Sequence, residues 1–153
     1  MAEDKEPRVA GGESPVAPGP ESGVPAREHP RPPHTSEELE LIRRYALLAA
    51  ATASGLKGED IRILDMHGLV TYTDYLVVCS GRSVRQTRRI AEEVALKLKK
   101  ELGLVPSHAE GEAHGEWILL DYLDFIVHVF TPEARRFYRL DVLWKEAPAE
   151  VIE

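Results

Sequence analysis

The chain has 153 residues, and its hydrophobic content of 43% is enough to bury one domain-sized core. Its 19 Lys and Arg against 26 Asp and Glu give a net charge of −7, which disfavours binding nucleic acid mainly by phosphate neutralisation. The single cysteine, Cys79, excludes an internal disulfide framework and a Cys-rich zinc site. Because no apolar run reaches membrane-spanning length, we expect a soluble cytoplasmic bacterial protein without membrane contact.

The amino-terminal segment, residues 1–35, holds eight of the eleven prolines and four of the eleven glycines and has almost no large apolar side chain. This composition predicts a disordered tail. Its six acidic residues outnumber its four basic ones, unlike the composition of a mitochondrial transit peptide. We expect the folded domain to span residues 36–146 and the carboxyl end, residues 147–153, to be frayed.

The first predicted element is a helix over residues 36–54, which begins with a hydroxyl residue followed by acids and has apolar residues at helical spacing. Two strands follow at residues 60–65 and 74–80, joined by a loop over residues 67–73. A second amphipathic helix begins near Gly81 and ends at Gly103. The second strand is apolar throughout, which predicts burial on both of its faces.

The remaining pattern begins with a short strand at residues 105–109 and a polar loop at residues 111–115. A hairpin follows, with strands at residues 117–121 and 125–130. A short helix at residues 132–138 and an apolar segment at residues 140–144 finish the pattern. The order of elements predicts an α+β fold, with a mixed β-sheet of about five strands and helices packed on it.

Three blocks of the sequence resemble the ribosomal silencing factor (Iojap-like) family in order and spacing. They are LDMHGL at residues 64–69 with TDY at 73–75; CSGRS at 79–83 with Gln86; and GEW at 115–117 with Asp121, Asp124, His128, EARRFY at 133–138 and LW at 143–144. One position departs from the family pattern, because Val70 stands where a small hydroxyl residue is expected.

The resemblance implies a regulator that binds the large ribosomal subunit through large-subunit ribosomal protein fourteen. Bound there, it would block joining of the small subunit and repress translation when nutrients are short. The resemblance also implies a nucleotidyltransferase-like topology without the catalytic set, no cofactor, and a homodimer away from the ribosome.

Trp117 is the residue that the resemblance places at the partner surface. An aromatic anchor of this kind often dominates binding energy, so Trp117→Ala should weaken binding without unfolding the domain. Without the resemblance, a tryptophan at the start of a strand is more simply interpreted as a core residue.

Five further residues are candidates for the partner contact. Tyr72, Thr73 and Asp74 precede a buried strand, where a loop can hold polar groups rigidly for recognition. Asp121 and Asp124 flank the hairpin turn, where they would meet the basic side chains of a ribosomal protein. The alternative for all the aspartates is a local turn that needs no partner.

A basic run at the start of the second helix, formed by Arg82, Arg85, Arg88 and Arg89, is an auxiliary candidate for ribosomal RNA contact, or else a solvated helix face. A regulator that binds RNA through this run is a further alternative, which the net charge disfavours. His128 alternates with apolar residues and is expected to be buried. The other histidines considered are too scattered in sequence for a recognisable metal-ligand spacing, so we expect no metal site.

An enzyme or nucleotide-binding module related to nucleotidyltransferases is the main alternative. Such an enzyme would use a Gly-Ser phosphate loop and paired aspartates that hold Mg²⁺. Here Arg82 interrupts the first motif, and Asp121 and Asp124 lie across a turn rather than on one strand face. Cys79 lies in an apolar strand, where burial should raise the pKa of its thiol. We therefore expect no catalytic residues.

Overall fold

The computed structural model describes residues 32–153, so the disorder predicted for residues 1–31 lies outside the described part of the chain. The elements follow the predicted order, with one additional strand at the carboxyl end. They are α2 (Ser36–Gly55), β1 (Glu59–Asp65), β2 (Tyr75–Ser80), α3 (Val84–Leu102), β3 (His108–Glu110), β4 (Trp117–Asp121), β5 (Phe125–Phe130), α4 (Pro132–Tyr138), α5 (Leu140–Leu143) and β6 (Ala149–Ile152). The predicted α+β class is confirmed.

One mixed sheet organises the chain, with strand order β3-β4-β5-β2-β1-β6. Its central pair, β2 and β5, is parallel and aligns Tyr75 with Phe125. The other neighbouring strands are antiparallel, including the predicted hairpin of β4 and β5. Both central strands are buried along their whole length, because helices cover both faces of the sheet.

The two long helices begin and end where local chemistry predicts. At α2, Thr35 and Glu38 form a reciprocal capping box that satisfies backbone donors at the helix start. At α3, the Ser83 side chain accepts from the amide of Gln86, and Gly103 ends the helix with a φ of 68°. Glycine adopts this left-handed conformation without steric cost.

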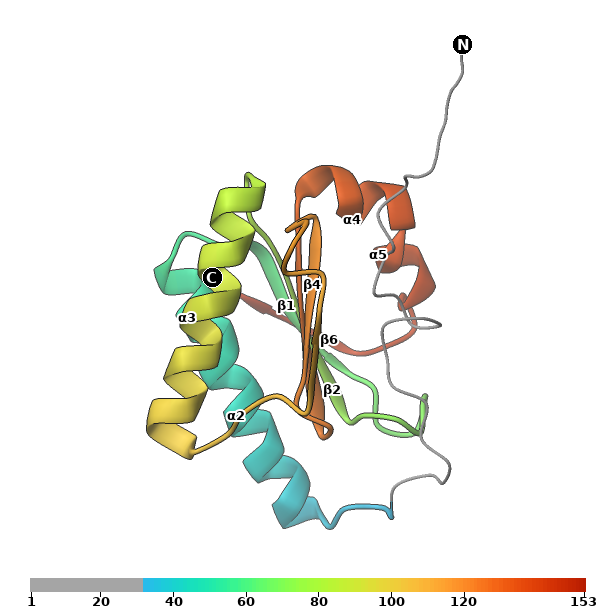
Figure 1. Cartoon of the computed structure of the whole chain (residues 1–153). Coiled ribbons are helices and arrows are strands. Elements are labelled where there is room, and N and C mark those ends of the chain that lie inside the picture. Colours follow the sequence, from blue (N-terminus) through green and yellow to red (C-terminus); the bar gives the residue numbers. More distant parts are fainter. Residues whose placement is uncertain (1–31) are drawn as a thin grey trace.

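The sheet separates two apolar layers (Figure 1). Helices α2 and α3 cover the face that we call the first face, with Ala49, Ile90 and Val94 fully buried against the sheet. The short helices α4 and α5 lie on the opposite, second face, which contains Trp117, Ile126 and Phe130. No helix among the described residues is long and apolar enough to cross a membrane.

The carboxyl end departs from the prediction of a frayed segment at residues 147–153. Residues 149–152 form β6, which pairs antiparallel with β1 from Ala149 opposite Leu64 to Ile152 opposite Ile61. An ion pair of 2.5 Å between Arg43 on α2 and Glu150 also ties this strand to the domain. The prediction was wrong because a four-residue strand carries little local signal and depends on a partner far away in sequence.

Candidate partner-binding surface

Trp117 lies in the core of the second face, with only 3% of its surface exposed. Its indole Nε1 donates a hydrogen bond of 2.9 Å to Nδ1 of His128 on the neighbouring strand. The rings of Phe130 and Tyr138 pack against it at centroid distances of 4.8 and 4.9 Å. The expectation of an exposed anchor is therefore wrong for this side chain, because Tyr138 on the later helix α4 packs on it.

His128 is buried as predicted, and its environment fixes its protonation. Because Nδ1 accepts from Trp117, the neutral ring carries its proton on Nε2. Burial lowers the pKa of His128 from 6.5 to about 3, since the charged ring would lose its hydration. The imidazole is thus a neutral part of the core at physiological pH.

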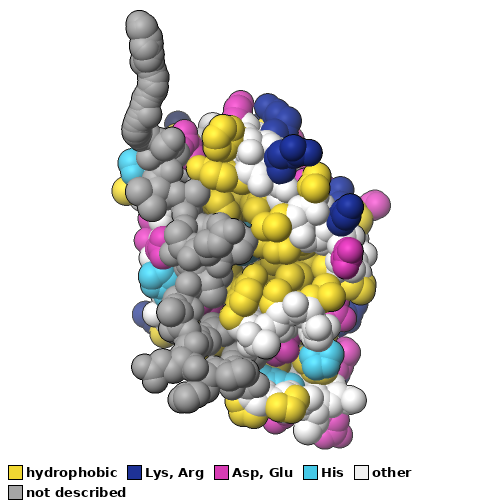
Figure 2. Space-filling view, turned by 90° about the vertical axis from the view of Figure 1, so that its right-hand side faces the viewer, with side chains coloured by type: hydrophobic (Ala, Val, Ile, Leu, Met, Phe, Trp, Pro, Cys, Tyr) yellow, Lys and Arg dark blue, Asp and Glu magenta, His cyan; other side chains and the backbone are white. Residues whose placement is uncertain are grey.

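The helices α4 and α5, which cover the second-face core, leave several of their apolar side chains in solvent. Tyr138 and Trp144 are partly buried, packed over Trp117 and His128 respectively. Around them Phe137 is 74% exposed and Leu143 is 57% exposed. Figure 2 shows hydrophobic side chains gathered on the face that carries α4 and α5. We call this surface the α4–α5 ridge, and it consists of Phe137, Tyr138, Val142, Leu143 and Trp144.

The α4–α5 ridge was not among the predicted contact residues, although its sequence was part of the family resemblance. A signal was present, since four large apolar residues and two further aromatics fall within eight positions around two short helices. Such a segment cannot bury all of these side chains against one sheet face.

Arg135 fastens α4 to the sheet. Its guanidinium is buried and donates hydrogen bonds of 2.9 Å both to the Asp60 carbonyl and to the Ser80 hydroxyl. The carboxylates of Asp60 and Asp141 each lie 3.4 Å from its other terminal nitrogen. One side chain therefore connects β1, β2, α4 and α5, and holds the ridge in place.

The other predicted contact residues divide by burial. Thr73, Asp74 and Asp121 are buried, and an Asp121 carboxylate oxygen accepts a hydrogen bond from the Leu123 amide within the hairpin turn. Tyr72 and Asp124 are only partly buried and reach the surface. Tyr72 packs against the second-face core, so it borders the same layer as the α4–α5 ridge.

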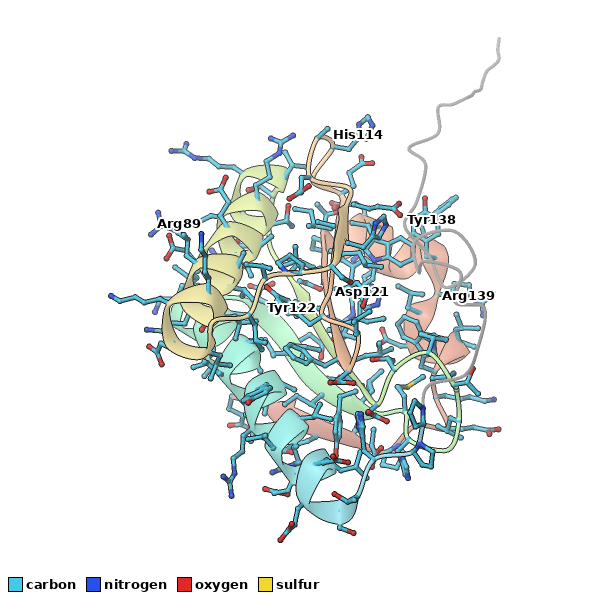
Figure 3. The ribbon with its side chains drawn as sticks, turned by 60° about the horizontal axis from the view of Figure 1, so that its bottom comes forward. Arg89, His114, Asp121, Tyr122, Tyr138 and Arg139 are labelled. Atoms are coloured by element: carbon cyan, nitrogen blue, oxygen red, sulfur yellow. The ribbon has the colours of Figure 1, made fainter. Side chains whose placement is uncertain are left out.

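The predicted basic run lies on the other side of the molecule. Arg82, Arg85, Arg88 and Arg89 are all exposed and belong to α3 or the turn before it, whereas the ridge belongs to the second face. Figure 3 shows Arg89 across the sheet from Tyr138 and Arg139. Arg82 pairs with Glu59 at 3.0 Å, and Arg88 donates to the carbonyls of Glu112 and Ala113. Two of the four cations thus already have partners within the chain.

A groove of about 420 Å³ lies on the first face between α3 and the β3–β4 edge. Its lining is mostly apolar, with the carboxylates of Glu92 and Glu112 beside Arg88. The backbone bonds of Arg88 and the two carboxylates make this groove unfavourable for phosphate groups. Cys79 lies in the first-face core, where burial raises the pKa of its thiol to about 12, in the predicted direction.

The fold and the site define an α+β protein with exposed apolar side chains over one face of its sheet. The profile of a family described as "Ribosomal silencing factor during starvation" matches residues 39–153. The chain belongs to this ribosomal silencing factor family, whose members are regulatory proteins associated with ribosomes.

Individual relatives agree with this assignment. A ribosomal silencing factor from Bacillus subtilis is 38% identical over 101 residues, which cover 66% of this chain and 85% of the relative. The chloroplastic Iojap protein of Zea mays is 32% identical over 104 residues, covering 67% of this chain and 44% of that protein. A crystal structure from Chromobacterium violaceum superposes with a TM-score of 0.65 at 34% identity, covering 73% of this chain and 92% of the other.

Proposed function

We propose that this protein binds the large ribosomal subunit through large-subunit ribosomal protein fourteen, and that its bulk then prevents the small subunit from joining. Translation is thereby repressed when nutrients are short. The observation that carries the proposal is the α4–α5 ridge of this member of the ribosomal silencing factor family, in which Phe137, Val142 and Leu143 are exposed to solvent.

The ridge has the chemistry of a protein contact. Aromatic residues are enriched at interfaces, and exposed apolar groups that lie together gain free energy when a partner removes them from water. Phe137 and Leu143 are the exposed anchors, while Tyr138 and Trp144 join them to the core. We assign Trp117 a positioning role, because its ring lies beneath Tyr138.

The polar candidates then take different roles. Tyr72 and Asp124 reach the surface, where an aspartate suits the basic side chains of a ribosomal protein. Thr73, Asp74 and Asp121 are buried, so we assign them to holding the loop and the hairpin turn in shape. The arginine run on α3 is proposed as a second, weaker contact with ribosomal RNA, on a separate side of the molecule from the ridge.

We propose a regulatory rather than an enzymatic role, with action at ribosomes in the bacterial cytoplasm. The groove beside α3 supports this, because its carboxylates disfavour nucleotide phosphates. Nucleotide with Mg²⁺ should therefore leave the melting temperature unchanged, since a ligand that binds the native state would raise it.

Sucrose-gradient sedimentation tests the function directly. The full chain should comigrate with purified large subunits and reduce their joining to small subunits. Leu143→Ala and Phe137→Ala should each weaken comigration about tenfold, in the range of an interface anchor. Leu96→Ala is a matched control, because Leu96 is 60% exposed on α3 and Leu143 is 57% exposed on the second face.

Two results would contradict the proposal at different levels. If the wild-type chain neither comigrates with large subunits nor reduces joining, the function is wrong. If it does both and the two ridge variants behave like Leu96→Ala, the function stands and the ridge is not the contact.

The same ridge offers a surface for a homodimer away from the ribosome. A dimer that buries Leu143 would compete with ribosome binding, so Leu143→Ala should also shift sedimentation equilibrium toward the monomer. An unchanged equilibrium in this variant would place any self-association elsewhere.

A further inference from the structure

Four polar side chains from separate parts of the chain meet at the end of the sheet where β2 and β5 begin. His34 comes from the segment before α2, His67 and Asp74 from the connection between β1 and β2, and Asp124 from the hairpin turn. His34 Nδ1 lies 3.6 Å from Asp74 Oδ2, and His34 Nε2 lies 3.3 Å from Asp124 Oδ1. His67 Nδ1 lies 3.7 Å from the other oxygen of Asp74.

We propose that His34, Asp74 and Asp124 bind a divalent transition-metal ion of the zinc type, with solvent completing its coordination. One donor atom from each residue can be chosen so that all three lie within 4.8 Å of one another. Neighbouring ligand atoms on a tetrahedral zinc ion are about 3.3 Å apart, given bonds of about 2.0–2.1 Å. Small side-chain rotations therefore close the set around an ion.

The donor types select the class of metal. Imidazole nitrogen with carboxylate oxygen suits zinc, cobalt and similar ions, whereas magnesium and calcium prefer oxygen ligands alone. His67 is placed to orient the Asp74 carboxylate from its other oxygen, as outer residues commonly do at metal sites.

The backbone holds these groups in position before any ion binds. The Asp74 amide donates to the Asp124 carbonyl at 3.0 Å, which fixes the loop against the hairpin turn. The Met66 amide donates to the Asp74 carbonyl at 2.8 Å, and the His67 amide donates to the Asp65 carboxylate at 3.0 Å. His34 directly precedes Thr35, whose capping box fixes the start of α2. This preorganisation lowers the entropic cost of assembling a coordination site.

The site is both sheltered and accessible. The Asp74 side chain is only 7% exposed and that of His34 is 20% exposed, whereas the side chain of Asp124 is 42% exposed. An ion can therefore reach the inner carboxylate from the solvent side at Asp124. The bound ion would connect the segment before α2 to the sheet and to the loop that carries Tyr72.

The site is a property of this chain rather than one inferred from the family match. His34 lies before residues 39–153, the part that matches the ribosomal silencing factor family. Sequence spacing gave no sign of the site, because its members are spread from position 34 to position 124. The prediction of no metal site rested on that spacing.

Titration of the tag-free, chelator-treated full chain with Co²⁺ and Zn²⁺ at neutral pH tests the proposal. We expect one ion per chain, a visible absorption band of low-symmetry Co²⁺ that Zn²⁺ removes, and a higher melting temperature with Zn²⁺ but not with Mg²⁺. His34→Ala and Asp124→Asn should each weaken Co²⁺ affinity at least about tenfold. His67→Ala should weaken it less, since His67 acts through Asp74.

His114→Ala and Glu112→Gln are matched controls. Both residues are exposed on the loop before β4, at the opposite end of that strand from Asp124, and their variants should keep wild-type affinity. Figure 3 shows His114 on this loop. Circular dichroism without metal checks that each variant is folded.

The proposal is overturned if the wild-type chain gives no stoichiometric Co²⁺ band. It is also overturned if folded His34→Ala binds as tightly as the His114→Ala control, because the cluster would then be a set of ion pairs only. Neither result depends on ribosome binding, so the metal site and the proposed function can fail separately.

Discussion

The two faces of the sheet are closed in different ways. On the first face, α2 and α3 are 20 and 19 residues long, and exposed apolar side chains such as Leu41 and Leu96 come from separate helices. On the second face, α4 and α5 have 7 and 4 residues, and their exposed apolar side chains are near neighbours in sequence. Exposed apolar side chains therefore lie close together in the chain where the helices that cover the sheet are too short to bury them.

The largest effect should come from the layer beneath the ridge. Trp117→Ala leaves a cavity under Tyr138 and should lower the free energy of unfolding by about 3–5 kcal/mol. Ile90→Ala on the first face should cost about 2–5 kcal/mol for the same reason. Urea unfolding measures both values.

A cost below about 1 kcal/mol for Trp117→Ala would contradict the assignment of Trp117 to a well-packed core on the second face. The expected cost also changes the use of this variant. Loss of ribosome binding by Trp117→Ala cannot be separated from loss of stability, so Phe137 and Leu143 are better probes of the contact.

Acid should act on the second face through His128. The folded protein keeps this ring neutral down to a pH of about 3, whereas the unfolded chain takes up a proton below the ordinary pKa of 6.5. The stability that the neutral His128 ring contributes is therefore fully present above pH 6.5 and is lost as the pH falls from 6.5 toward 3. Lowering the pH from 7 to 5 should reduce the free energy of unfolding by about 2 kcal/mol through this histidine.

His128→Asn isolates this effect, because its amide oxygen can replace Nδ1 as the acceptor for Trp117 and does not titrate. Urea unfolding at pH 7 and pH 5 should show a smaller pH dependence in this variant than in the wild type. Equal pH dependence in the two proteins would mean that His128 is not the titrating group.

Attachment of α4 should depend on one side chain. Arg135→Met keeps the apolar stem but removes the bonds to Asp60 and Ser80, and should cost about 1–2 kcal/mol because the two carboxylate partners can be rehydrated. Hydrogen exchange should become faster in α4 and α5 and stay unchanged in α3. Arg136→Met, at an exposed neighbouring position, is the control; a uniform change over both faces would argue against local anchoring.

The smallest effect is expected on the ridge itself. Phe137→Ala should change the free energy of unfolding by less than about 0.5 kcal/mol, because most of the ring is already in solvent. Thermal and urea unfolding measure this change. A cost comparable to that of Trp117→Ala would show that Phe137 is a core residue and would remove it from the proposed contact.

The helices and the hairpin were predictable because their signals are local. Apolar spacing and the caps at Thr35 and Ser83 define α2 and α3, and a three-residue turn at residues 122–124 separates two apolar runs in the β4–β5 hairpin. The strand β6 was missed because its pairing with β1 is a long-range contact. Residues 149–152 alone do not specify that partner.

The candidate site was only partly predictable, since burial depends on what packs above a residue. The family resemblance indicates a role for Trp117 in partner binding, but the sequence does not show that Tyr138 lies over its ring. In the same way, nothing in the spacing of His34 and Asp124 indicates that α2 begins beside the hairpin turn. Contacts between distant segments decide both features.

The parallel pairing of β2 with β5 has a consequence for folding kinetics. The antiparallel pairs on either side, β1 with β2 and β4 with β5, join neighbours in the chain and close short loops. The centre of the sheet instead aligns Tyr75 with Phe125, so α3 and the β3–β4 region must be spanned before the two halves meet. Because closing this long loop costs entropy, we expect the pairing of β2 with β5 to be the slow step in folding, and the core on both faces of the sheet to be completed after it.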